Sequence, residues 1–247
     1  MKKILNYLFE YKTLDKATAK EILVNISKGI YNESELAAFM TVFLMRSITV
    51  EELSGFREAL LELCLRVDLN GYEVLDIVGT GGDGKNTFNI STLSCFLAAG
   101  AGVQVAKHGN YGVSSITGAS NVMEALGYKF KNDTGKLKNE LEQTGLCFLH
   151  APLFHPALKN VAPVRKQLGV RTFFNMLGPL VNPAFPKYQF IGVYSLELAR
   201  AYNYLFQRTD KQYVILYSLD GYDEISLTSD AMVISNRGQR IYTPEEL

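Results

Sequence analysis

The spacing of hydrophobic side chains along the chain changes once, near residue 70. Before that point, apolar residues recur at helical intervals, most clearly over residues 17–26 and 35–45. Thr49 and Glu52 stand three positions apart, as in a capping box, and we expect them to open a helix that runs through Leu65. Residues 1–70 are therefore predicted to form a small domain made only of helices.

From residue 74 onward, short runs rich in β-branched and aromatic residues alternate with helical segments. The runs read VLDIV, VQVAK, CFLHA, YQFIGVY and QYVILYS. This alternation predicts the α/β fold class, with a mostly parallel sheet and crossover helices in a larger domain over residues 71–247. Ligands of such sheets bind at the carboxyl ends of the strands, so candidate chemistry is expected there.

Composition excludes several classes of function. Basic and acidic residues number 25 each, so no net field favours a nucleic acid or an anionic membrane as a partner. No apolar run reaches the ~18 residues of a membrane span, and the charged start MKKILNYLFEYKTLDK lacks the cleavage site of a signal peptide. Three cysteines, each in an apolar run, indicate buried, reduced thiols and a cytoplasmic protein.

The first predicted strand runs into a glycine-rich loop, DIVGTGGDGKNTFNIST, over residues 76–92. Gly79, Gly81 and Gly84 fit the dinucleotide pattern G-x-G-x-x-G, but the loop is long and no acidic residue follows ~20 positions on. The P-loop pattern fails at Asn86, where a magnesium-binding hydroxyl is required. The glycines and the helix that follows them therefore predict a site for another anion.

A second group of polar residues follows the next predicted strand. Lys107 stands at the strand end, and Ser114, Ser115 and Gly118 come just after it. Taken singly, the lysine could be a solvated surface residue and the serines a helix cap. Two such groups at neighbouring strand ends instead suit a ligand that carries two separate phosphate groups.

The order of these motifs resembles a known family. The stretches are GTGGD, N-x-S-T, KHGN, the SS-x-x-G turn, HPALKNVAPVRKQLGVRTFFNMLGPLVNPA and DGYDEIS. They resemble the anthranilate phosphoribosyltransferases, whose fold is of the nucleoside phosphorylase/phosphoribosyltransferase type. The resemblance implies transfer of a phosphoribosyl group from phosphoribosyl pyrophosphate to the amino group of anthranilate, in tryptophan biosynthesis. It also implies a homodimer formed through the helical domain.

The resemblance assigns site residues as well. For anthranilate it implies Gly79, Asn110 and Arg165. His108 is a candidate catalytic residue, which could polarise or line the site or could simply satisfy a backbone carbonyl. The residues implied to bind phosphoribosyl pyrophosphate are Gly79, Gly82, Asp83, Thr87, Asn89, Ile90, Ser91, Thr92, Lys107, Ser114, Ser115 and Ala119.

A magnesium cofactor is implied too, held by Ser91, Asp223 and Glu224. Mg²⁺ prefers oxygen ligands and is commonly bound by one or two carboxylates together with substrate phosphates. Neighbouring residues of a strand point to opposite faces, so Asp223 and Glu224 must lie in a loop to serve one site. We expect that loop to be exposed and to contribute little to stability.

The sequence departs from the family's usual pattern at several positions. Tyr111 stands where arginine commonly follows KHGN, and His150 where an aromatic residue is usual. The turn usually written G-S-A-D reads Gly118-Ala119-Ser120-Asn121 here. These departures affect the predicted phosphate contacts, whereas Arg165 and the Asp223–Glu224 pair match the family.

Two alternatives remain at this point. A pyrimidine nucleoside phosphorylase would have the same fold, but its loop usually reads T-G-G-V-G-D and it lacks a match to VAPVRKQLG. A non-catalytic nucleic-acid-binding relative would show a strongly basic surface, which the zero net charge does not favour.

The end of the chain reads as the start of a helix. Thr243 can cap, Pro244 suits the first helical position and Glu246 can reach back, yet only Leu247 follows. Members of the family usually continue beyond this point. We therefore expect a C-terminally shortened chain with an unpaired sheet edge, exposed apolar surface and weak turnover.

Overall fold

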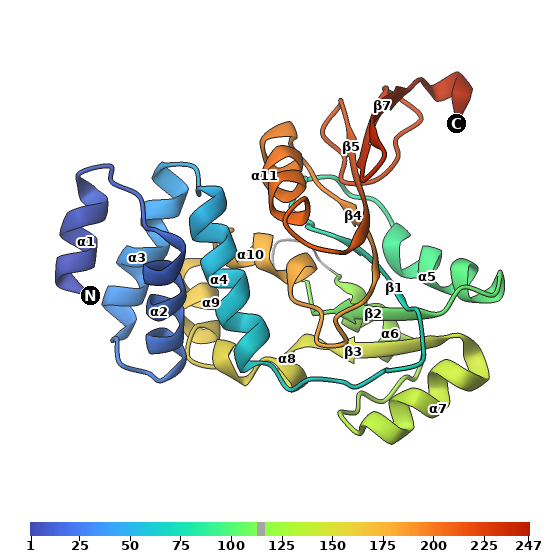
Figure 1. Ribbon diagram of the computed structural model, residues 1–247, viewed down its shortest axis with the longest axis horizontal. Helices are drawn as coiled ribbons and strands as arrows, with labels where there is room; N and C mark the ends of the chain where they lie inside the picture. Colours follow the sequence, from blue (N-terminus) through green and yellow to red (C-terminus); the bar gives the residue numbers. More distant parts are fainter. Residues whose placement is uncertain (113–116) are drawn as a thin grey trace.

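The computed structural model describes residues 1–112 and 117–247. Figure 1 shows a helical bundle beside a sheet with helices on both of its faces. The bundle begins with four helices: α1 (Lys2–Phe9), α2 (Lys16–Ser27), α3 (Glu33–Met45) and α4 (Val50–Leu63). The predicted capping box is confirmed, because Thr49 N–H donates to the Glu52 carboxylate at 2.9 Å and Glu52 N–H donates to the Thr49 hydroxyl at 3.2 Å. The helix ends two residues before the predicted Leu65.

A segment from the middle of the chain completes the bundle. Its elements are η1 (Pro156–Leu158), α9 (Ala162–Leu168), α10 (Phe174–Leu177) and η2 (Gly178–Leu180). Phe173 packs against Phe39, Phe43 and Phe56 of the N-terminal helices, with ring centroids 5.9, 4.9 and 4.7 Å apart. This buried aromatic cluster fixes α9 and α10 to the bundle, on the side that faces the sheet.

The sheet contains seven strands in the order β3-β2-β1-β4-β5-β6-β7. The first five of these are parallel, and β6 and β7 continue the sheet in antiparallel fashion. All five strands predicted from the sequence are confirmed, and the mostly parallel α/β fold with them. Their bounds are β1 (Leu75–Gly79), β2 (Val105–Gly109), β3 (Leu146–His150), β4 (Tyr188–Gly192), β5 (Gln212–Ser218), β6 (Ala231–Ser235) and β7 (Gly238–Tyr242).

The strand order creates a crevice between β1 and β4. The chain leaves β1 through α5 (Ile90–Gly100) toward β2, and leaves β4 through α11 (Leu196–Phe206) toward β5, in the opposite direction. The two helices accordingly lie on opposite sides of the central strands (Figure 1). Because the connections diverge here, the carboxyl ends of β1 and β4 border an opening in which ligands of such sheets bind.

The remaining elements are α6 (Ala119–Ala125), α7 (Thr134–Thr144), α8 (Ala151–Phe154) and η3 (Pro244–Glu246). The predicted helix start at the end of the chain forms one 3₁₀ turn, in which Thr243 N–H donates to the Glu246 carboxylate at 3.0 Å. Within the described ranges, no helix is long and apolar enough to cross a membrane. The division into domains at residue 70 stays a prediction.

Candidate active site

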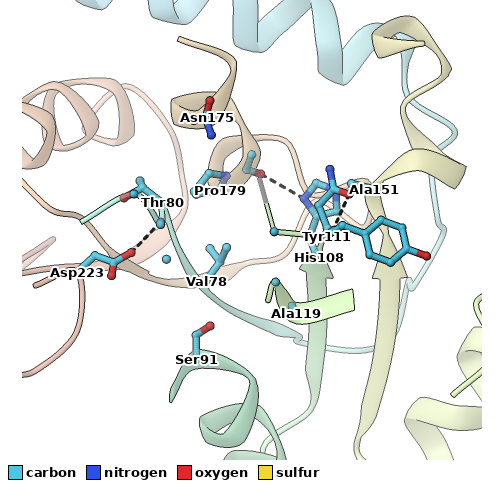
Figure 2. A pocket seen from close by; sticks show the side chains of 18 of the residues that line it. Val78, Thr80, Ser91, His108, Tyr111, Ala119, Ala151, Asn175, Pro179 and Asp223 are labelled. Carbon is cyan, nitrogen blue, oxygen red and sulfur yellow. Dashed lines mark hydrogen bonds between the residues drawn. The ribbon is translucent and has the colours of Figure 1, made fainter. Parts of the chain in front are cut away.

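A cavity of about 270 Å³ opens at the carboxyl ends of β1 and β2, beneath the segment that carries α9 and α10. Figure 2 shows Asp223 and Thr80 at one end of it and His108 and Tyr111 at the other. The cavity brings together thirteen of the predicted site residues: Gly79, Gly82, Asp83, Thr87, Asn89, Ser91, Lys107, His108, Asn110, Ala119, Arg165, Asp223 and Glu224.

Two predicted site residues that the structure describes are not part of this lining. Ile90 and Thr92 begin α5, but they do not line the cavity. The Thr92 side chain is buried, and its N–H donates to Asn89 Oδ1 at 3.1 Å, which caps the helix. Ser114 and Ser115 lie outside the described residues.

The glycine loop turns through three left-handed residues. Gly81, Gly82 and Gly84 have φ values of 63°, 80° and 74°, which side chains other than glycine rarely adopt. The loop delivers the chain to the N-terminus of α5, where Ser91 faces the cavity. The glycine loop and the positive end of the helix dipole therefore converge on one region, as an anion site requires.

Lys107 is buried at the base of this region, with 2 % of its surface exposed. Its ammonium group donates to the Ile77 carbonyl oxygen at 2.7 Å and to the Ser91 hydroxyl at 3.4 Å. The alternative of a solvated surface lysine is therefore wrong. A buried ammonium beside a helix N-terminus adds a full positive charge to the anion site.

Asp223 and Glu224 lie in the loop between β5 and β6, as predicted, but that loop is not exposed at this point. Asp223 is only 7 % exposed, and its carboxylate accepts a hydrogen bond from Gly81 N–H at 2.7 Å. Burial, and then the charge of Asp83, raise the pKa of Asp223 to about 6. Burial, and then the charge of Asp223, raise the pKa of Glu224 to about 7, although Lys107 opposes this. The expectation of an exposed loop is corrected.

These carboxylates suit a hard cation shared with a ligand. Asp83 Oδ2 is buried with no hydrogen-bond partner, so negative charge in this region is only partly compensated. A backbone hydrogen bond from Ser91 N–H lowers the pKa of the Glu224 carboxyl. The three predicted metal ligands, Ser91, Asp223 and Glu224, therefore lie close together. Among the described residues, no three His, Cys, Asp or Glu side chains could hold a metal by themselves. The oxygen donors fit Mg²⁺ that takes its other ligands from phosphate and water.

Arg165 lies on α9 at the opposite wall of the cavity. One guanidinium nitrogen donates to Asn175 Oδ1 at 3.2 Å, while Nε is buried without a partner. Burial lowers the pKa of Arg165. No carboxylate of the described residues forms an ion pair with it. An arginine in this state can bind a planar carboxylate through its remaining donors.

His108 and His155 lie next to each other between the two walls, with ring centroids 5.2 Å apart. Burial, and then the neighbouring His155, lower the pKa of His108 to about 3, and burial lowers the pKa of His155 to about 4. Both rings are therefore neutral at neutral pH. His108 Nδ1 lies 3.2 Å from the Gly178 carbonyl oxygen and must donate to it, so the unpartnered Nε2 is left as an acceptor.

The residues that depart from the family pattern contact one another. The Ser120 hydroxyl lies 2.8 Å from His150 Nδ1, and the Tyr111 ring stands edge-on to His150 at 5.0 Å. The Tyr111 hydroxyl also donates to Glu124 on α6 at 2.7 Å. Asn110 is held beside them, because its carbonyl accepts Ser120 N–H at 3.0 Å.

Two further residues were not singled out from the sequence. Asn175 connects Arg165 to the Thr172 N–H, which donates to the same amide oxygen at 3.1 Å. Arg171 donates to the Gly82 carbonyl oxygen and lies over the Tyr194 ring at 4.8 Å. Both lie within the quoted stretch GVRTFFNML, but nothing in local sequence indicates which of its polar residues reach the site.

Comparison with known proteins agrees with this geometry. Residues 2–64 match the family described as "Glycosyl transferase family, helical bundle domain", and residues 71–244 match "Glycosyl transferase family, a/b domain". An anthranilate phosphoribosyltransferase from Christiangramia forsetii is 64% identical over 98% of this chain and 73% of its own length. The chain thus spans about three quarters of this relative.

Solved structures give the same result. The anthranilate phosphoribosyltransferase of Thermus thermophilus has a TM-score of 0.88 and 34% identity, over 98% of this chain and 73% of its own. The enzyme of Saccharomyces cerevisiae, in complex with PRPP and Mg, has a TM-score of 0.88 and 30% identity, over 98% and 72% of the two chains. The chain therefore belongs to the anthranilate phosphoribosyltransferase family.

Proposed function

We propose that this chain transfers the phosphoribosyl group of phosphoribosyl pyrophosphate to the amino group of anthranilate, releasing pyrophosphate and supplying tryptophan biosynthesis. One observation carries the proposal: a single cavity has an anion site with a buried lysine at one end and, at the other, a half-buried arginine whose Nε has no hydrogen-bond partner. The name of the family and the PRPP complex of the yeast relative support this assignment.

The anion site is assigned to the phosphoribosyl donor. Backbone N–H groups of the glycine loop and the α5 N-terminus would hold the pyrophosphate, with Lys107 stabilising its charge. Stabilisation of the leaving group matters here. As the bond between the anomeric carbon and the pyrophosphate breaks, the carbon gains cationic character and negative charge grows on the pyrophosphate. The roles of Ile90, Thr92, Ser114 and Ser115 in this site rest on the family resemblance.

Magnesium is proposed as the cofactor, held by Ser91, Asp223 and Glu224. When bound, it would neutralise charge on the pyrophosphate. The buried carboxylates supply the oxygen donors for this role, and Lys107 partly offsets their charge when phosphate is absent.

The opposite end of the cavity is assigned to anthranilate. Arg165 would bind the carboxylate, and Gly79 and Asn110 would border the aromatic ring. Neutral His108 would accept a hydrogen bond from the amino group through Nε2. This contact orients the nitrogen lone pair toward the sugar without requiring a strong base.

The chemistry that follows is a single displacement. The amino nitrogen forms a bond to the anomeric carbon as the bond from that carbon to the pyrophosphate oxygen breaks, and the electron pair leaves with pyrophosphate. The new ammonium then loses its proton. An aryl amine is a weak nucleophile, so the chain contributes mainly by holding two substrates in line and stabilising the leaving group.

The proposal extends to the assembly of the chain and to its location. A homodimer through the helical region would cover apolar side chains that α3 exposes, such as Met45, which is 80 % exposed. A cytoplasmic protein is in keeping with Cys64, Cys95 and Cys147, which are buried free thiols.

Three assays separate this function from its alternatives. Anthranilate fluorescence should fall only when phosphoribosyl pyrophosphate and Mg²⁺ are both present. A pyrimidine nucleoside phosphorylase would instead cleave thymidine or uridine with inorganic phosphate. A nucleic-acid-binding relative would shift DNA in a salt-dependent manner and leave both small substrates unchanged.

A further inference from the structure

Two glycines leave a notch at the crevice between β1 and β4. Gly79 ends β1 and Gly192 ends β4, and the two residues are direct partners in the sheet. A Cβ added to Gly79 would lie 2.7 Å from Asp223 Oδ2. A Cβ added to Gly192 would overlap the Asp223 carbonyl oxygen and lie 2.8 Å from its carbonyl carbon. Asp223 therefore occupies space that two missing side chains leave free.

The loop that carries Asp223 is also bound to the end of β5. Ser218 is fully buried, and its hydroxyl donates to the Glu224 carbonyl oxygen at 2.6 Å. The same hydroxyl accepts from Ser226 N–H at 3.0 Å. One hydroxyl thus holds the loop immediately after its two acidic residues, and its bonds are to backbone atoms, so they fix where the chain runs.

The notch connects this acidic loop to the glycine loop. The carboxylate that lies in it accepts the Gly81 N–H at 2.7 Å. Gly81 lies two residues after the end of β1 and has left-handed backbone geometry. A displacement of Asp223 would therefore break one of the bonds that hold the glycine loop as well as move the carboxylates.

We infer that Gly192 and Ser218 are positioning residues for the donor site: Gly192 by its lack of a side chain, Ser218 by its hydroxyl. Neither lines the cavity, so they act only through Asp223 and Glu224. The requirement at Gly192 is for space, because its φ does not lie in the left-handed region. The identity of the ligand in this inference rests on the proposed function. The contacts of Gly192 and Ser218 with the loop that carries Asp223 and Glu224 do not depend on it.

The first test measures the coupling alone, in the full chain without ligand. Gly192→Ala and Ser218→Ala should increase amide hydrogen exchange in peptides that cover residues 79–85, because the Asp223–Gly81 bond weakens. Gly100→Ala is the matched control. A Cβ at Gly100 meets nothing within 4 Å, so its exchange pattern should equal that of the unaltered chain. Unchanged exchange in both variants would overturn the coupling, whatever the protein's activity.

The second test measures the donor site by calorimetric titration with pyrophosphate, with and without Mg²⁺. Gly192→Ala should weaken the magnesium-dependent binding roughly ten- to a hundredfold, since small misplacements of this kind are costly. Magnesium-independent binding, which relies on Lys107 as well as on the glycine loop, should weaken less than the magnesium-dependent binding. Ser218→Ala removes only a hydroxyl and should weaken the same magnesium-dependent binding. It therefore replaces Gly192→Ala in this test if that variant does not fold.

The outcomes distinguish this inference from the proposed function. Magnesium-dependent binding that is equal in the unaltered chain, in Gly192→Ala and in Ser218→Ala would refute the positioning role while leaving the function intact. Pyrophosphate that does not bind the unaltered chain would refute the proposed function, and the exchange experiment would still decide the coupling.

Discussion

The Ser120 hydroxyl lies 2.8 Å from His150 Nδ1, and both side chains are buried. At these positions the resembling family usually has alanine and an aromatic residue, neither of which could form this bond. We therefore expect that each of the two departures compensates for the other. The pair joins α6 to the end of β3, directly behind the loop in which Asn110 lies.

A double-mutant cycle tests this compensation. Ser120→Ala and His150→Phe should each destabilise the fold by ~1–3 kcal/mol, because each leaves one buried polar group without its partner. The double variant should be more stable than the sum of the two effects predicts, with a coupling of about 1 kcal/mol. Urea unfolding of the four proteins gives the result, and strictly additive effects would disprove the compensation.

Arg165→Ala should affect anthranilate and spare the phosphate site. Loss of a charge-assisted contact to a carboxylate costs ~1.5–3 kcal/mol, so the KM for anthranilate should rise roughly ten- to a hundredfold. The KM for phosphoribosyl pyrophosphate should change little. The neighbouring exposed Lys166, replaced by alanine, serves as the control. If both constants rise together in Arg165→Ala, the arginine is structural.

The double variant Asp223→Asn/Glu224→Gln should lose activity without losing stability. Asp223 is buried and Glu224 is half-buried beside it, and both lie near Asp83, so removing their charge relieves repulsion. We expect the thermal midpoint in magnesium-free buffer to be equal to or above that of the unaltered chain. Activity should fall to the limit of detection. Retained magnesium dependence would show that the metal binds elsewhere.

Two buried neutral histidines make stability depend on pH. The pKa of His108 is lowered to about 3 and that of His155 to about 4, both mainly by burial. In the unfolded chain the histidine pKa values are near 6.5, so between the folded pKa values and pH 6.5 the unfolded chain binds more protons than the folded one. The contribution of the two histidines to the free energy of unfolding is therefore complete above pH ~6.5 and is lost as the pH falls below it.

The variant His155→Gln isolates one of these contributions from the carboxyl groups that titrate in the same range. Its deficit in the free energy of unfolding, relative to the unaltered chain, should shrink by on the order of 1 kcal/mol per pH unit below pH 6.5. Urea unfolding from pH 7.5 to pH 5 measures it. A deficit that stays constant over this range would mean that His155 is already protonated in the fold or exposed.

The fold was largely predictable because the information is local. Each of the five parallel strands is a short apolar run between helical segments, and the periodicity of these runs is enough to identify them. β6 and β7 were missed; β7 is exposed along most of its length and so has no buried face to produce a pattern. The return of residues 156–180 to the helical bundle was missed because it depends on Phe173 meeting side chains more than a hundred positions away.

The residues of the candidate site were predicted from sequence motifs and not from the spacing of hydrophobic residues. Glycines, Lys107 and Arg165 could be named because they stand in stretches that resemble the family, but the burial of Lys107 could not be predicted. The burial of Asp223 depends on Gly192, which lies in another strand and in no motif. The Ser120–His150 bond likewise joins residues thirty positions apart. Such relationships arise only when strands are placed side by side.

The most direct measurement of the central claim is the stoichiometry of the proposed reaction. The full chain, at high concentration so that slow turnover is visible, is mixed with anthranilate, phosphoribosyl pyrophosphate and Mg²⁺. Anthranilate fluorescence and released pyrophosphate are then followed together. We expect one pyrophosphate for each anthranilate consumed, with no reaction when either substrate is left out. Pyrophosphate release that does not depend on anthranilate, or phosphorolysis of thymidine or uridine in its place, would contradict it.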